Sequence, residues 1–239
     1  MTVDNRAICG AINNADWYEA VFSAHGLRYR RLAFAFVAED TPPPYYSKLT
    51  VLSPEENANV LLELAKLATR FAGTLSLKDS FCQLGLAQNG FESLFEASWL
   101  WRAPRQVSVP RGWEKLSNAK DLLLWEECWK RNGSPTDQRM FPETLLARDD
   151  VNFFGRRAND RFIAGCIVNR SAESIGLSNV FAETPSEAFF AQAADTAASV
   201  DGDLPVVGYE SGDELVFAHQ ADFDTVGQLR ILVTRQAEF

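Results

Sequence analysis

The clearest alternation of apolar and polar positions lies between Arg161 and Val233. Large apolar residues alternate with small or polar ones over 162–169 and again over 175–182, and a polar turn over 170–173 separates the two runs. This pattern is typical of a β-hairpin. Beyond it, the sequence predicts a helix, a strand, a second helix and a last strand, over 184–200, 204–209, 213–220 and 227–233.

A similar order of elements occurs nearer the N-terminus. Ser53-Pro54 opens a helix over 56–71, as Thr184-Pro185 opens the helix described above, with the hydroxyl residue as the expected N-cap. A strand precedes each helix and another follows it. The repeat predicts two related units, 1–104 and 113–239, joined by a linker over 105–112. The alternative is that two unrelated α/β halves align equally well.

Smaller signals fill in the expected order. Each unit has an aromatic pair four residues apart followed by a glycine, which indicates a helix that ends at the glycine; the pairs are Tyr18 and Phe22 before Gly26, and Trp125 and Trp129 before Gly133. In the first unit we expect one strand over 31–37. Asp79 and Ser80 are expected to cap a further helix.

This order of elements, with the segment 206–232, resembles the C-terminal half of the GCN5-related N-acetyltransferase (GNAT) family. In that family a Gly-Phe pair precedes the last strand, and Asp222-Phe223 holds that place here. The resemblance implies an α+β fold in three layers, with a mixed, mostly antiparallel central sheet flanked by helices, here in two related units. It also implies the family's reaction, direct acyl transfer from acyl-coenzyme A to an amine.

The resemblance also implies where a cofactor would bind. The backbone of Asn179, Val180 and Phe181 is expected to hold the pantetheine arm, and Thr184 and Ser186 lie in the loop that opens the next helix. The cofactor expected is acetyl-CoA or another acyl-CoA, with no metal. In the family the pyrophosphate rests on a glycine-containing loop at this place, where free backbone N–H groups meet the phosphates.

The corresponding loop, 182–187, departs from the family pattern. It has no glycine, Pro185 removes one N–H donor, and Glu183 and Glu187 add negative charge. Two carboxylates beside a diphosphate would oppose binding by roughly 1 kcal/mol or more at a protein surface. The loop therefore argues against the usual way of holding the pyrophosphate.

The family's usual general acid is also missing. A tyrosine often stands a few residues before the Gly-Phe pair, and Ala218 is the residue at that position here. The neighbouring His219 and the strand residue Tyr209 are the candidate acids that remain. The alternative for His219 is a surface or cap histidine, and for Tyr209 a strand aromatic with its hydroxyl in water.

Composition narrows the class of protein. The chain has 239 residues, 46% of them hydrophobic, and no apolar run exceeds strand length, so we expect a soluble cytoplasmic protein without a membrane segment. The formal charge of −9 argues against nucleic acid, and Arg28-Tyr29-Arg30-Arg31 is the only tight basic cluster that includes an aromatic residue. Four widely spaced cysteines form no metal motif.

Two functions remain open. The first is an acyl-CoA-dependent N-acyltransferase acting on a small-molecule or peptide amine, whose positive charge an acidic surface would attract. The second is a non-catalytic binding or scaffolding protein of the same fold, which has lost the pyrophosphate loop. A homodimer is compatible with either function.

Overall fold

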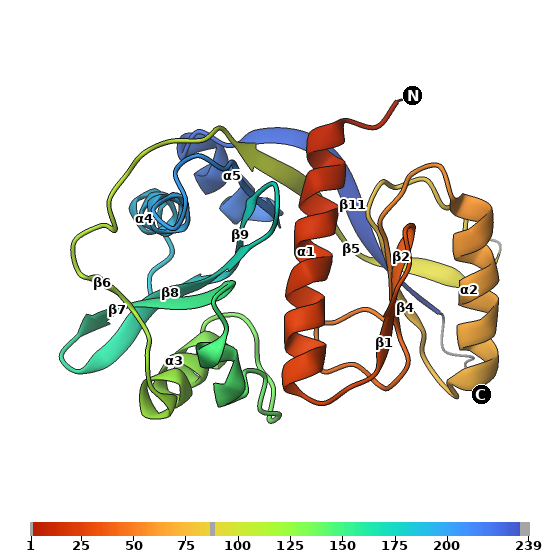
Figure 1. Ribbon diagram of the computed structural model, residues 1–239, viewed down its shortest axis with the longest axis horizontal. Coiled ribbons are helices and arrows are strands. Elements are labelled where there is room, and N and C mark those ends of the chain that lie inside the picture. Colours follow the sequence, from red (N-terminus) through yellow and green to blue (C-terminus); the bar gives the residue numbers. More distant parts are fainter. Residues whose placement is uncertain (1, 87–88, 235–239) are drawn as a thin grey trace.

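The structure is a computed structural model that describes residues 2–86 and 89–234. Its elements follow one another as α1 (Asn5–Ala24), β1 (Tyr29–Arg31), β2 (Ala35–Ala38), β3 (Leu49–Val51), α2 (Asn57–Arg70), β4 (Ser76–Asp79), β5 (Phe91–Arg102), β6 (Trp113–Lys115), α3 (Ala119–Arg131), the 3-10 helix η2 (Glu143–Ala147), β7 (Val151–Ala158), β8 (Arg161–Arg170), β9 (Ile175–Ala182), α4 (Glu187–Ala198), β10 (Val206–Glu210), α5 (Gly212–Gln220) and β11 (Asp224–Thr234). Figure 1 shows α1 between a part of the molecule that carries α2 and a part that carries α3 and α4.

The strands of the described chain form one eleven-stranded sheet in the order β1-β2-β3-β4-β11-β5-β10-β9-β8-β7-β6. The same series of strand pairings occurs in both halves of this sheet. β1, β2 and β3 pair antiparallel and β3 pairs parallel with β4, as β7, β8 and β9 pair antiparallel and β9 pairs parallel with β10. The expected fold, a mixed and mostly antiparallel sheet with helices on it, is confirmed.

The centre of the sheet joins the two halves by an exchange of strands. β11 lies between β4 and β5, and β5 lies between β11 and β10, with antiparallel pairing throughout. The strands that precede and follow the segment 105–112, which was expected to be a linker, therefore belong to one continuous sheet. The division of the chain into units at that segment stays a prediction.

Helices cover both faces of the sheet. A cluster of aromatic residues joins α1 and α3 to one face, and Ile167 of β8 belongs to it. The neighbouring residues Cys166 and Val168 belong to a second cluster, which holds α4 and α5. Because neighbouring residues of a strand point to opposite faces, α1 and α3 lie on one face and α4 and α5 on the other. This is the expected three-layer arrangement.

Four local expectations are corrected by the structure. The expected strand over 31–37 is instead the β1–β2 hairpin. No helix follows Asp79 within the described residues up to 86; its carboxylate instead accepts the N–H groups of Gln83 and Leu84 and pairs with Arg230. The N-cap of α4 is Ser186, whose hydroxyl accepts the N–H of Phe189, so the helix begins after Pro185 rather than at it. Likewise α2 is not capped by Ser53: its N-cap is Glu56, which makes no side-chain capping hydrogen bond.

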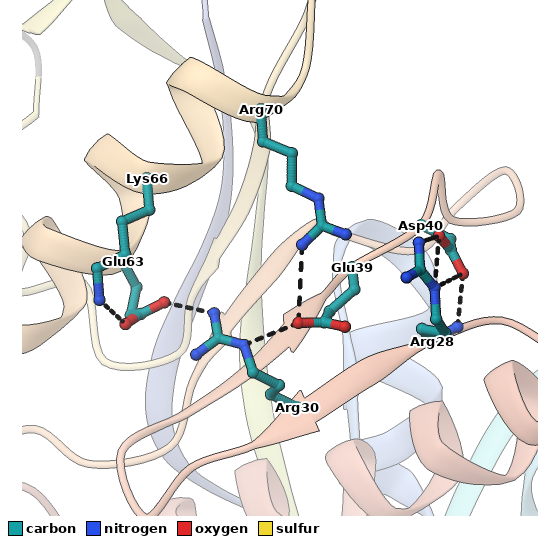
Figure 2. A network of polar contacts seen from close by, with 7 residues as sticks. All are labelled: Arg28, Arg30, Glu39, Asp40, Glu63, Lys66 and Arg70. Atoms are coloured by element: carbon teal, nitrogen blue, oxygen red, sulfur yellow. Dashed lines mark hydrogen bonds and ion pairs between the residues drawn. The ribbon is translucent and has the colours of Figure 1, made fainter.

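The basic cluster near the N-terminus is neutralised by carboxylates. Arg28 pairs with Asp40 at 2.7 Å, and Arg30 bridges Glu39 of the same hairpin and Glu63 of α2, at 3.2 and 2.5 Å (Figure 2). These contacts fasten α2 to the β1–β2 hairpin. They also leave little free positive charge for phosphates.

Among residues 2–86 and 89–234, no helix has the length and apolarity needed to cross a membrane.

Candidate active site

The sheet opens between β9 and β10. These two parallel strands pair only at Ile175 with Val206 and at Gly176 with Val207. Beyond that point Gly208 faces the carbonyl oxygen of Leu177, and a Cβ atom at Gly208 would lie 2.7 Å from it. Only glycine allows this close approach, after which the two strands separate.

A β-bulge in β9 lies beside this opening. Gly165 of β8 pairs with Phe181, but Ile167 pairs with Ser178, so β9 has one more residue than β8 between these pairs. Asn179, within the bulge, takes a φ of 52°. A bulge turns backbone groups out of the regular ladder, and here they face an edge that β10 does not cover.

A cavity of about 190 Å³ occupies the opening. Its lining residues are Gly10, Asn13, Asn14, Trp17 and Tyr18 of α1; Tyr45, Tyr46, Trp99, Trp129, Met140, Phe141 and Asn169; Gly176, Leu177, Ser178, Asn179 and Val180 of β9; and Val207, Gly208, Tyr209 and Glu210 of β10. The aromatic side chains give it an apolar wall, and a few polar groups converge on it. This combination is typical of a small-molecule site.

Two titratable residues of β10 reach the cavity. They are neighbours in a strand, so Tyr209 lies on the α1 side and Glu210 on the α5 side. Burial, with a smaller effect of Glu214, raises the pKa of Glu210 to about 8. The ammonium of Lys78 favours ionisation of Tyr209, but burial and the neighbouring Tyr18 and Glu210 outweigh it, so the pKa of Tyr209 lies above its usual value.

A buried polar network fixes α1 against the strands of the site. The amide nitrogen of Asn13 donates to the carbonyl and hydroxyl oxygens of Ser174, and that of Asn169 donates to the carbonyl and amide oxygens of Asn13. Gly176 lies against the same groups, because a Cβ atom there would be 2.0 Å from the Asn13 amide oxygen. The network holds the α1 wall of the cavity in place.

Several expected site residues lie at this opening. Asn179, Val180 and Tyr209 line the cavity. Val180, Phe181 and Ser186 line a smaller adjacent cavity of about 50 Å³ at the start of α4. Sequence reasoning missed the α1 residues, although the two consecutive asparagines Asn13 and Asn14, in the middle of the helix, were a usable signal.

Two expected residues lie away from both cavities. Thr184 is exposed and is not among the lining residues of either one. His219 is exposed near the end of α5, where its Nε2 lies 2.9 Å from the hydroxyl of Thr225. Tyr209 is therefore the better placed of the two candidate acids.

The start of α4 is poorly suited to a diphosphate. Besides Ser186, its small cavity is lined by Pro185, Phe189, Phe190 and Phe217 and by one carboxylate, that of Glu214. The Ser186 hydroxyl already accepts one of the N–H groups that a helix N-terminus offers. The nearby Glu183 forms an ion pair with Arg161, which offsets part of its charge.

No group of three or more His, Cys, Asp or Glu residues is placed to hold a metal ion in the described chain. The cysteines also have no partner thiol: Cys128 and Cys166 are buried, Cys9 is half-buried and Cys82 is exposed. Burial raises the pKa of the Cys166 thiol far above its usual range.

Comparison with known proteins supports the fold. The sequence matches no protein-family model and no curated protein. A GCN5-related N-acetyltransferase from Kribbella flavida is similar at a TM-score of 0.64 and 12% identity, over 95% of this chain and 96% of that one. One from Sphaerobacter thermophilus is similar at 0.54 and 10%, over 95% and 90%.

A larger enzyme is similar as well. Saccharomyces cerevisiae N-myristoyltransferase with bound myristoyl-CoA matches at a TM-score of 0.55 and 10% identity, over 84% of this chain and 66% of that one. The shared architecture spans most of the chain in all three comparisons. The chain has the fold of the GCN5-related N-acetyltransferases.

Proposed function

We propose that the protein transfers an acyl group from acyl-coenzyme A to the amine of a small molecule or peptide. The observation that carries the proposal is the opening between β9 and β10, which holds a cavity lined by residues of both faces of the sheet. A donor on one face and an acceptor on the other could meet there. The fold, which the compared N-acetyltransferases share, supports the same reaction class.

The bulged part of β9 offers the place for the pantetheine arm. Ser178, Asn179 and Val180 line the cavity, and β10 leaves this edge without a paired strand. Pantetheine carries amide groups that can pair with such an edge as a strand would. Since the α4 loop lacks the usual phosphate cradle, we expect the arm and the acyl group to supply most of the binding free energy.

The reaction needs one base and one acid. When the amine attacks the thioester carbonyl, a C–N bond forms, the C–S bond breaks, and the amine loses a proton. Glu210, with a pKa of about 8, is placed in the cavity to accept that proton near neutral or mildly alkaline pH. We propose that the departing CoA thiolate takes its proton from water, which leaves the hydroxyl of Tyr209 in the cavity wall free to bind the ligand.

Isothermal titration with acetyl-CoA and with CoA tests the proposal. We expect saturable binding of both ligands, with dissociation constants on the order of micromolar. A release assay for free thiol would then screen amine acceptors, and Glu210→Gln should lower the rate most strongly above pH 8. If the folded protein shows no heat change with either ligand, the non-catalytic alternative holds instead.

A further inference from the structure

A fully buried lysine lies directly behind the cavity wall. Lys78 of β4 has no exposed surface. Its Nζ lies 2.6 Å from the side-chain oxygen of Asn14, 3.4 Å from the hydroxyl of Tyr209, and 4.8 Å from the centre of the Tyr18 ring. These three neighbours line the cavity, although Lys78 itself does not.

The charge of this lysine has no protein counter-ion. No carboxylate of the described residues forms a salt bridge with Lys78, whereas the equally buried Glu126 has two cationic partners. Burial opposes the charged form of Lys78, but the phenol groups of Tyr18 and Tyr209 outweigh it and raise the pKa of the lysine above its usual value. The amide oxygen of Asn14 and the faces of the Tyr18 and Tyr209 rings, whose centres lie 4.8 and 4.5 Å from Nζ, also favour the ammonium form. A buried cation without an anion is costly, and an anionic ligand would offset the cost.

The lysine also determines which groups of Asn14 and Tyr209 remain free to donate a hydrogen bond. An ammonium group has only donors, so the hydroxyl oxygen of Tyr209 and the amide oxygen of Asn14 must both accept from it. The hydroxyl hydrogen of Tyr209 and the amide nitrogen of Asn14 are left as donors, and neither has an acceptor among the described residues. Because both side chains line the cavity, these donors are available to a ligand.

We propose that this end of the cavity binds the carboxylate of a ligand, through the hydrogens of Tyr209 and Asn14, with Lys78 as a positioning residue behind them. The proposal rests on the proposed function and narrows its substrate. The carboxylate belongs either to the acceptor, as in an amino acid or a peptide C-terminus, or to a carboxylated acyl group on CoA. Both sources present the same chemistry to the same donors.

The test compares pairs of ligands that differ in this one charge. In the first arm, L-alanine, L-leucine and L-phenylalanine are titrated beside their carboxamides, with and without CoA. In the second arm, succinyl-CoA is titrated beside butyryl-CoA. We expect the carboxylate to improve affinity in one of the arms by about tenfold or more, as hydrogen bonds to a charged group do. The arm that shows the preference identifies the source.

Variants separate this role from a structural one. Lys78→Met and Tyr209→Phe should each abolish most of the preference for the carboxylate, while affinity for butyryl-CoA changes little in Lys78→Met. Lys48→Met is the matched control, because Lys48 donates to the carbonyl of Thr74 and does not line the cavity. Its preference should equal that of the unaltered protein. Circular dichroism confirms that each variant is folded.

Two results would overturn the inference. One is equal affinity for both members of every pair in the unaltered protein; the other is a carboxylate preference that survives in Lys78→Met. If butyryl-CoA and acetyl-CoA bind but no pair shows a preference, the acyltransferase proposal stands and this inference fails. If no CoA ligand binds but amino acids are preferred over amides, the reverse holds.

Discussion

The carboxylate of Glu126 should be one of the most important single groups for stability. It is buried on α3 and accepts the backbone N–H groups of Met140 and Phe141, at 2.8 and 3.2 Å. Lys130 and Arg139 also pair with it, at 3.0 and 2.9 Å. It therefore fastens the chain after α3 to the helix, at a segment that forms part of the cavity wall.

Replacing Glu126 by alanine leaves two buried N–H groups without an acceptor. Each such group costs about 1–3 kcal/mol, while the two partly exposed cations can regain water, so we expect a loss of about 2–5 kcal/mol in the free energy of unfolding. For a protein of this size, that corresponds to a fall of roughly 5–15 °C in the melting temperature. Urea unfolding followed by tryptophan fluorescence measures it, because Trp125 and Trp129 lie on the same helix.

The matched control is Glu127→Gln, since Glu127 is the exposed neighbour on the same helix. It should change the free energy of unfolding by no more than about 0.5 kcal/mol. A loss of less than about 1 kcal/mol in Glu126→Ala, or equal destabilisation of the two variants, would show that the carboxylate does not stabilise the fold in this way. A stable Glu126→Ala variant would mean that water replaces the carboxylate without cost.

Three other outcomes follow from the site. Gly208→Ala should weaken acetyl-CoA binding and cost about 1–3 kcal/mol of stability, whereas Gly85→Ala, which has open space around it, should do neither; equal binding by both, measured by titration, would contradict this. The native state holds a proton on Glu210 up to about pH 8, so stability should decline as pH rises from 4.5 to about 8, and urea unfolding of Glu210→Gln should lack this part of the decline. Cys82 should be the fastest thiol to react with a chromogenic disulfide and Cys166 the slowest, so loss of the fast phase is expected in Cys82→Ser; an unchanged fast phase would show that another thiol is more accessible.

The parts of the fold that the sequence predicted are those with regular periodicity and clear helix starts. The hairpin of β8 and β9 was confirmed because two short apolar runs of β-type residues flank a polar turn over 170–173. The β1–β2 hairpin was not, because Leu32, Ala33 and Phe34 make the turn as apolar as the strands around it. Asp79 has the chemistry of an N-cap, but its carboxylate is satisfied by a turn and by Arg230 instead.

The site was harder to predict than the fold. The strand residues Asn179, Val180 and Tyr209 could be placed because they follow recognisable elements. Lys78 could not, because a lysine in a strand usually lies at the surface, and only the packing of α1 against β4 and β10 buries it. Side chains that meet from distant parts of the chain leave no local pattern.

The exchange of β5 and β11 has a consequence for how the protein folds. Leu77 of β4 pairs with Leu232 of β11, 155 positions later, so the first half cannot complete its sheet until the end of the chain is available. Such high contact order predicts slow folding, and during synthesis β4 and β5 expose edges open to aggregation. Topologically, the monomer is equivalent to a domain-swapped dimer whose two chains have been joined end to end. Each half then depends on the other for a strand, and neither should fold when expressed alone.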